Sequence, residues 1–135
     1  MSAAFAAALL VAPLLWLLRA TWAMPHAVLA PQPVAVALAL LIYPCLEEFI
    51  FRGALQPALA RALARRASRA PGGFSAANAL TSLAFAALHL LRQADPAALL
   101  TFFPSLVFGW FRDRHGTLWR SIVLHAWYNV GAFIG

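Results

Sequence analysis

Two glutamates, Glu47 and Glu48, stand side by side in the apolar stretch YPCLEEFIFRG and make up half of the four acidic residues in the chain. A carboxylate at the centre of a bilayer costs about 2.5–3.5 kcal/mol, so a tandem pair needs a partner or a wet cavity. In a helix, Glu48 and Arg52 are four residues apart and diverge by only about 40°, so they can pair. Arg52 lies about 140° from Glu47. We therefore expect Arg52 to neutralise Glu48 and to leave Glu47 unpaired.

Two histidines and an asparagine stand in other apolar stretches. His89 follows Phe85 by four residues, so both side chains share one helical face. Asn129 stands in the same relation to His125. A lone histidine in a membrane helix is often a packing residue that hydrogen-bonds to a neighbouring helix. Ionisable groups inside membrane segments are nevertheless candidates for function.

Together these side chains have the chemistry for peptide-bond hydrolysis. A glutamate shielded from bulk water can take a proton from a bound water molecule, and neutral histidines can position that water or protonate a leaving amine. An asparagine amide can donate to the oxyanion of a tetrahedral intermediate. The alternative is a structural ion cluster in which the glutamates and Arg52 only fix helix packing.

Other hydrolytic chemistries have weaker support in the sequence. Cys45 is the single cysteine, so it forms no internal disulfide. No HExxH motif is present, and the serines within the apolar stretches lack a nucleophile-elbow context. A zinc ion held by Glu47, His89 and His125, with an open position for water, is the metal-dependent alternative.

The composition identifies an integral membrane protein. Hydrophobic residues make up 64% and charged residues 10% of the 135 residues, and the mean hydropathy is +0.80. Soluble domains hold roughly half apolar and about a quarter charged residues. A soluble domain of this size could not bury so much apolar surface. All ten basic residues are arginines, and most lie in short runs that are not interleaved with aromatics in a polar setting, so we exclude nucleic-acid binding.

Five apolar stretches approach the ~20 residues that a membrane-crossing helix needs. They cover residues 4–19, 32–56, 74–91, 96–111 and 117–134. The second continues as an amphipathic arm, and Gly53 and Pro57 within it are compatible with a bent helix. The predicted fold is all-α, a polytopic transmembrane helical bundle of about five spans with a polar catalytic cavity. We divide the chain into a first span and loop at 1–30 and a core at 31–135.

The arginines set the expected orientation. The loops after the second and fourth spans hold Arg61, Arg65, Arg66, Arg69, Arg112, Arg114 and Arg120. The other side receives only Arg19 and Arg92. The positive-inside rule therefore places the N-terminus in the cytoplasm and the C-terminus outside. The Ala-rich composition without lysine indicates a bacterial origin, so we expect the bacterial inner membrane.

The polar residues fall into three short motifs. EEFIFRG, FAALH and HAWYN resemble the motifs EExxxR, FxxxH and HxxxN/D of the CPBP intramembrane proteases, a family that includes the CAAX prenyl endopeptidases and the bacteriocin-processing Abi proteins. Each motif alone is short, but all three occur in order, each in its own apolar stretch. The resemblance covers about residues 36–132.

The resemblance implies an α-helical intramembrane endopeptidase of glutamic or metallo type. Carried over residue by residue, it assigns catalysis to Glu47, His89, His125 and Asn129. It assigns supporting roles to Glu48, Arg52 and Phe85. Glu47 would activate the water and Asn129 would donate to the oxyanion. No cofactor is expected on this reading, with zinc as the alternative.

The expected partners are the lipid bilayer and a membrane-embedded or lipid-anchored protein or peptide substrate. Processing of a membrane-anchored peptide is favoured over the maturation of prenylated proteins, which is a eukaryotic activity. One rival hypothesis is a non-catalytic scaffold or immunity protein of the same fold, which would tolerate loss of Glu47. Another is a small transporter or proton relay, which would need a continuous wet path to both faces. The sequence does not predict the oligomeric state.

Overall fold

The computed structural model describes residues 2–22, 32–64 and 73–133, and all regular structure within them is helical. Residues 23–30 of the predicted loop after the first span, and the arginines at 65, 66 and 69, lie outside the described residues. The α-helices are α1 (Ala3–Trp22), α2 (Pro33–Ala37), α3 (Tyr43–Glu48), α4 (Gln56–Leu63), α5 (Ala76–Gln93), α6 (Phe102–His115) and α7 (Trp119–Val130). Two π-helical turns, η1 (Leu38–Ile42) and η2 (Phe49–Leu55), and two 3₁₀ turns, η3 (Pro96–Thr101) and η4 (Gly131–Phe133), complete them. The all-α prediction is confirmed.

The segments from α2 to α4 form one continuous helix, Pro33–Leu63. Within the described residues, this is the one helix that is long and apolar enough to cross a membrane. It has 31 residues, and its most apolar 18-residue window has a mean hydropathy of 2.0. Only 22% of its most apolar window is buried, unlike the core helix of a soluble protein. The apolar helix Ala3–Leu17 is shorter. The count of five spans therefore stays a prediction for the other four stretches.

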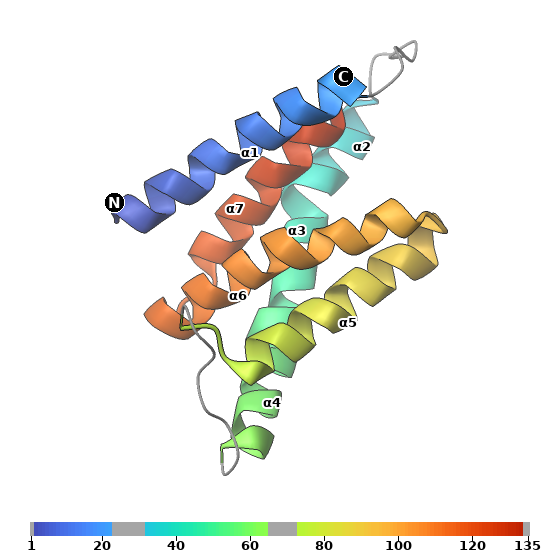
Figure 1. Ribbon diagram of the computed structural model, residues 1–135. Coiled ribbons are helices and arrows are strands. Elements are labelled where there is room, and N and C mark those ends of the chain that lie inside the picture. The colour runs from blue at the N-terminus through green and yellow to red at the C-terminus, as the bar shows by residue number, and fades with distance from the viewer. Residues whose placement is uncertain (1, 23–31, 65–72, 134–135) are drawn as a thin grey trace.

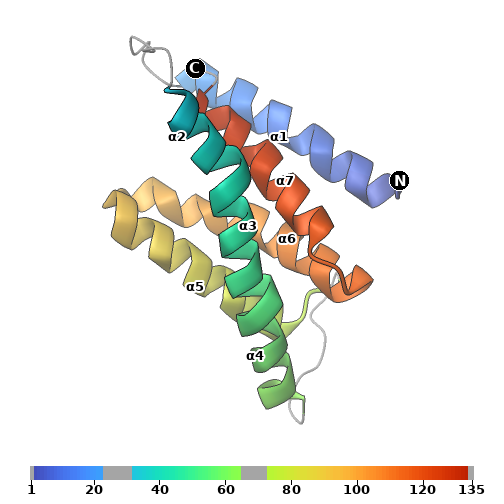
Figure 2. The same ribbon diagram turned by 180° about the vertical axis from the view of Figure 1, so that it is seen from behind.

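The helices form two pairs that the long helix joins. In both views α5 and α6 lie side by side, and α1 runs along α7 (Figures 1 and 2). The long helix passes behind these pairs in Figure 1 and in front of them in Figure 2. Residues from α3, α5 and α7 are thereby brought to a common centre, which is where the three sequence motifs meet.

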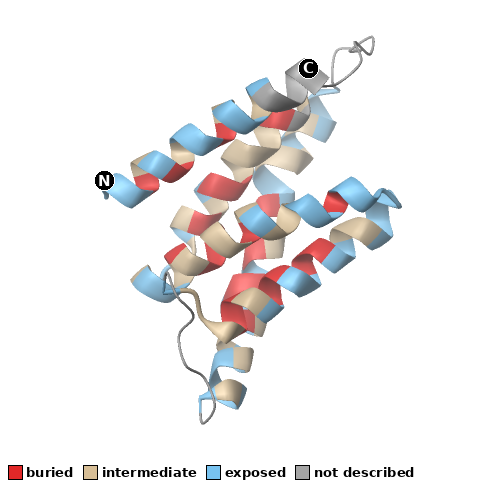
Figure 3. Cartoon of the chain, viewed as in Figure 1, coloured by how far each residue is buried: buried red, intermediate tan, exposed pale blue. Residues whose placement is uncertain are grey.

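Figure 3 shows which parts of the chain are buried and which are exposed. A cluster of polar side chains is buried, whereas many large apolar side chains are exposed. Leu91, Val34 and Leu10 are 81%, 70% and 68% exposed. The buried polar residues are Glu48, Arg52, Gln56, Asn78, Thr81, Ser82, Ser105, Ser121 and His125. An apolar core of Phe5, Ala8, Phe108, Phe111 and Leu124 packs beside them. Buried polar side chains within a bundle whose exterior is largely apolar are the arrangement expected where the surrounding solvent is lipid.

The π-helical turn η1 exists because a proline follows it. In this turn Tyr43 N–H bonds five residues back to Leu38 O. The next donor in that register would be Pro44, which has no N–H, so the carbonyl of Ala39 loses its helical partner. Asn129 Nδ2 of α7 donates to that carbonyl at 2.9 Å. A side chain from another helix therefore completes the backbone of the long helix here.

The same arrangement recurs at η2. Gln56 N–H bonds to Phe51 O, and Pro57 follows without an N–H. The carbonyl left over is that of Arg52, and Arg112 Nε of α6 donates to it at 3.0 Å. The irregularity expected near Pro57 is thus present, and its free carbonyl is satisfied from a neighbouring helix. Both π-helical turns flank α3, which carries the two glutamates.

Candidate active site

Glu48 is fully buried and joins two partners from opposite sides. Its Oε2 lies 3.4 Å from Arg52 Nε, so the ion pair predicted from the four-residue spacing is confirmed. Its Oε1 lies 3.0 Å from His125 Nδ1. A carboxylate only accepts hydrogen bonds, so Nδ1 carries the proton and donates it. Glu48 therefore ties α3 to α7 as well as to its own helix.

Arg52 is held in a cage of rings and one serine. Its Nη2 donates to Ser105 O at 2.8 Å and also to Ser105 Oγ. The guanidinium lies 5.0 Å from the Phe85 ring centroid and 5.9 Å from those of Phe51 and Phe108. Aromatic faces attract cations, most strongly where water is excluded. Ser105 carries no sequence signal for this role, because its partner is 53 residues away.

Glu47 contacts two cationic or ionisable groups from other helices. Its Oε2 lies 3.5 Å from His125 Nε2, and its Oε1 lies 3.2 Å from Arg92 Nη1. The Glu47 side chain is 13% exposed, whereas that of Arg92 is 53% exposed, so the pair lies at the edge of the polar interior. The expectation that Glu47 is unpaired is therefore wrong. Arg92 follows Glu47 by 45 residues, so the helical spacing around Glu47 could not predict this contact.

His125 lies between the two glutamates, with one ring nitrogen near each carboxylate. Its ring stacks on Phe108 at a centroid distance of 5.3 Å and an interplanar angle of 20°. A neutral ring that donates from Nδ1 to Glu48 presents a lone pair at Nε2 toward Glu47. A protonated ring also carries a proton on Nε2, which lies 3.5 Å from Glu47 Oε2. His125 is thus placed to exchange a proton with Glu47.

His89 lies on the other side of Phe85. Its Nδ1 is 3.0 Å from Phe85 O, a carbonyl that can only accept, so the Nδ1 proton is donated there and Nε2 of the neutral ring keeps its lone pair. The Phe85 ring centroid lies 4.3 Å from that of His89 and 5.5 Å from that of His125. No direct hydrogen bond joins His89 to Glu47 among the described residues.

Asn129 is occupied in part by the backbone of the long helix. One of its two amide hydrogens serves the carbonyl of Ala39, so a second amide hydrogen remains for another acceptor. The contacts of the described side chains do not connect Asn129 directly to Glu47 or His89. The three sequence motifs therefore meet through His125, while His89 and Asn129 flank it.

The side chains do not form a ready-made metal site. Among the described residues, no group of three or more His, Cys, Asp or Glu side chains has the arrangement to hold a metal ion. This holds for the alternative zinc ligands Glu47, His89 and His125. As arranged, these three side chains do not fit a resident zinc ion.

Comparison with known proteins gives one match. Neither the search of curated proteins nor the search of solved structures matched this chain. A family model described as "Type II CAAX prenyl endopeptidase Rce1-like" matches residues 28–131, a range that includes all three motifs and the buried cluster. That family consists of membrane-embedded proteases. The chain belongs to the Rce1-like family of type II CAAX prenyl endopeptidases.

Proposed function

We propose that this protein is an intramembrane endopeptidase that hydrolyses a peptide bond of a membrane-embedded or lipid-anchored substrate with a glutamate-activated water. The observation that carries the proposal is the placement of His125 between Glu47 and Glu48, with one ring nitrogen facing each carboxylate. A structural ion cluster needs only the buried pair of Glu48 and Arg52. The second carboxylate and the bridging imidazole supply an acid and a base, which hydrolysis requires.

Glu47 acts as the general base in this proposal. It accepts a proton from water as the water oxygen forms a bond to the substrate carbonyl carbon. The carbonyl oxygen becomes an oxyanion. The C–N bond then breaks, and the amine leaves with the proton that Glu47 received, passed on directly or through His125. The products are a new carboxyl terminus and a new amino terminus.

His125 and Glu48 act as a unit. The Nδ1–H···Oε1 bond to Glu48 fixes the ring orientation and directs Nε2 toward Glu47. Positive charge that develops on the ring is stabilised by Glu48, in the way that a buried carboxylate supports the histidine of a catalytic triad. Arg52 in turn holds the Glu48 carboxylate in place.

His89 and Asn129 complete the site from either side. His89 has its Nε2 lone pair available, which can accept a hydrogen bond from the attacking water. The second amide hydrogen of Asn129 is available to the oxyanion. Removal of such a donor lowers the rate by about 10²–10³-fold. Phe85 separates the two histidine rings and fixes their spacing by contact with both.

Arg92 is a positioning residue that the motifs do not include. Its bond to Glu47 Oε1 orients the carboxylate so that Oε2 faces His125. Its guanidinium also lies 5.7 Å from the ring centroid of Tyr43, one helical turn before Glu47. Because Arg92 is half exposed, we place the substrate entrance beside it, where an incoming peptide would reach its contact with Glu47.

The membrane placement follows from the long helix. Glu47 and Glu48 fall at the midpoint of Pro33–Leu63, so insertion of this helix sets them near the middle of the bilayer. We propose further that the whole protein is a polytopic bundle with a polar cavity. It would lie in a bacterial inner membrane with its N-terminus in the cytoplasm. Arginine counting supports the orientation.

Incorporation of heavy oxygen tests hydrolysis directly. The full-length protein in proteoliposomes is incubated with membrane-anchored peptides in water labelled with oxygen-18, and the products are mapped by mass spectrometry. The proposal expects a new carboxyl terminus that carries one labelled oxygen. Products without the label, or equal cleavage by protein-free liposomes, would overturn it.

A further inference from the structure

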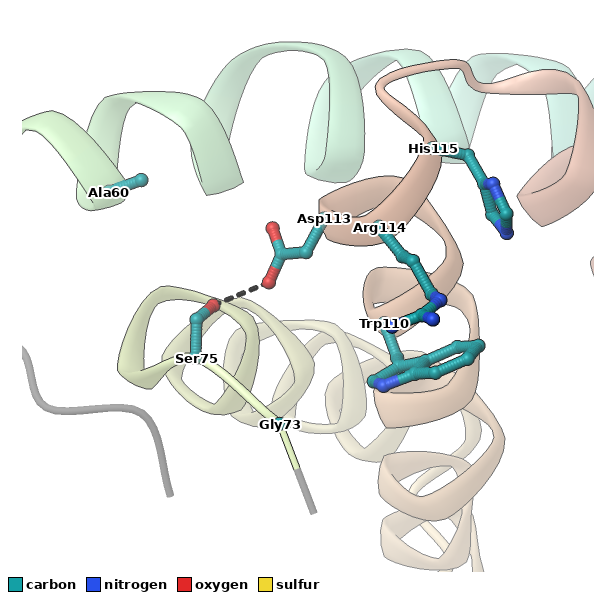
Figure 4. A pocket seen from close by; sticks show the side chains of 7 residues that line it. All are labelled: Ala60, Gly73, Ser75, Trp110, Asp113, Arg114 and His115. Carbon is teal, nitrogen blue, oxygen red and sulfur yellow. Dashed lines mark hydrogen bonds between the residues drawn. The ribbon is translucent and has the colours of Figure 1, made fainter. Parts of the chain in front are cut away.

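A cavity of about 660 Å³ lies at the junction of α4, α5 and α6, away from the catalytic cluster. Its lining includes Ala60, Ser75, Trp110, Asp113, Arg114 and His115 (Figure 4). None of the motif residues lines it, so the proposed proteolysis does not explain it. The ends of α4 and α6 meet at this cavity, which agrees with the expectation that the loops following them share one side.

The one carboxylate in the cavity wall already has donors from the protein. Asp113 Oδ1 accepts from Gln56 Nε2 at 2.7 Å. Its Oδ2 accepts from Ser75 Oγ at 2.6 Å (Figure 4). Ser75 Oγ also accepts from Asn78 N–H and caps α5. Asp113 thus joins three helices at the cavity, and its role there is structural.

The other large side chains of the cavity wall are basic or aromatic, namely Arg114, His115 and Trp110. The guanidinium of Arg114 lies 5.4 Å from the ring centroid of Trp110, and the two side chains run together along the cavity in Figure 4. Arg120 and Trp119 form a second such pair at 4.6 Å on the next helix. Burial, and then the charges of Arg120 and Arg114, lower the pKa of His115. Positive potential therefore dominates this end of the molecule despite Asp113.

The cavity lies at the depth of lipid headgroups if the long helix spans the bilayer. Ala60 follows Glu47 by thirteen residues on the same helix, which is about 20 Å along its axis at 1.5 Å per residue. The hydrocarbon core extends only about 15 Å from its centre. Paired tryptophan and arginine side chains are typical of this interface.

We propose that this cavity binds the phosphate of an anionic phospholipid headgroup, with Arg114 as the main charged contact and Trp110 at the boundary between headgroup and acyl chain. The shared chemistry is phosphate recognition, and the lipid is favoured over a free phosphate by the depth of the cavity. The inference depends on membrane insertion of the long helix and is independent of proteolysis.

Competition between two lipids tests the proposal. The full-length protein is reconstituted in nanodiscs that hold equal amounts of phosphatidylglycerol and phosphatidylcholine, and retained lipids are counted by native mass spectrometry. An arginine close to an anionic headgroup favours that lipid by about fivefold. We expect the wild type to prefer phosphatidylglycerol and Arg114→Gln to lose about fivefold of that preference. Arg114→Lys should retain it.

Arg120→Gln is the matched control, because it removes the same charge from the same end without touching the cavity wall. Its preference should stay near that of the wild type. Equal retention of the two lipids by the wild type would overturn the proposal even if Arg114→Gln failed to fold. Equal losses in Arg114→Gln and Arg120→Gln would assign the effect to general surface charge and would also overturn it. Displacement of the lipid by millimolar inorganic phosphate would identify a soluble-anion site instead.

Discussion

Asn129 Nδ2 donates a 2.9 Å hydrogen bond to the carbonyl of Ala39, the oxygen that Pro44 leaves without a helical donor. The last residue of the HxxxN motif therefore supports the backbone of the helix that carries the glutamates. This contact is independent of any role in stabilising an oxyanion, since Asn129 has two amide hydrogens. The two roles are separable by experiment.

Asn129→Leu removes both hydrogens while keeping the size of the side chain. We expect stability to fall by about 1–3 kcal/mol, because Ala39 O loses its donor. We expect kcat to fall by about 10²–10³-fold, because the oxyanion loses its donor. Thermal unfolding and cleavage assays, the latter run far below the unfolding temperature, separate the effects. A less stable protein with unchanged kcat would leave Asn129 with the structural role alone.

Glu48→Gln should destabilise the protein. It leaves Arg52 buried without its carboxylate, and breaking a buried ion pair typically costs about 3–5 kcal/mol. It also weakens the bond to His125 Nδ1. Urea or thermal unfolding in detergent measures the loss. The double variant Glu48→Leu, Arg52→Met is the control, because it removes both charges and should recover part of the stability; a stable single variant would mean that the pair contributes little.

Arg92→Gln should lower kcat and leave the fold intact. The Arg92 side chain is half exposed, so we expect a stability change within about 0.5 kcal/mol. Misplacing a catalytic group costs up to about 10²-fold, so kcat should fall by tenfold or more. Arg92→Lys should restore part of the rate. Arg61→Gln is a suitable control, because it removes an exposed arginine from α4, far along the helix from Glu47. An unchanged kcat in Arg92→Gln would remove Arg92 from the site.

A metal chelator should leave cleavage unchanged. The described His, Cys, Asp and Glu side chains form no group of three that is arranged for a metal ion, and Glu47 with His125 supplies the acid and base without one. Cleavage rates are compared before and after exhaustive chelation. Loss of activity that zinc restores would instead show that the site rearranges around a metal ion, with Glu47, His89 and His125 as its ligands.

The parts of the site that were predictable from sequence are those governed by local geometry. The pair of Glu48 and Arg52 follows from a four-residue spacing on one helix, and the common face of Phe85 and His89 follows in the same way. The all-α fold follows from composition and from the lengths of the apolar stretches. These inferences need no knowledge of how the helices pack.

Contacts between residues of distant helices could not be predicted from the sequence. Arg92 was counted only as a loop arginine, because nothing in its own neighbourhood points to Glu47. Pro57 was compatible with a bent helix, but no prediction was made from Pro44, and the side chains that satisfy the two freed carbonyls come from α6 and α7. Which residue donates there depends on tertiary packing.

The most direct test of the account is the rate of peptide cleavage by Glu47→Gln. The substitution keeps the shape of the side chain and removes the carboxylate that accepts the proton from water. Glu47→Asp, which keeps a shortened carboxylate, serves as the comparison, and unfolding curves verify that both variants remain folded in the membrane. The account predicts no detectable cleavage by Glu47→Gln and residual cleavage by Glu47→Asp. Wild-type cleavage by a folded Glu47→Gln protein would contradict the assignment of Glu47 as the general base.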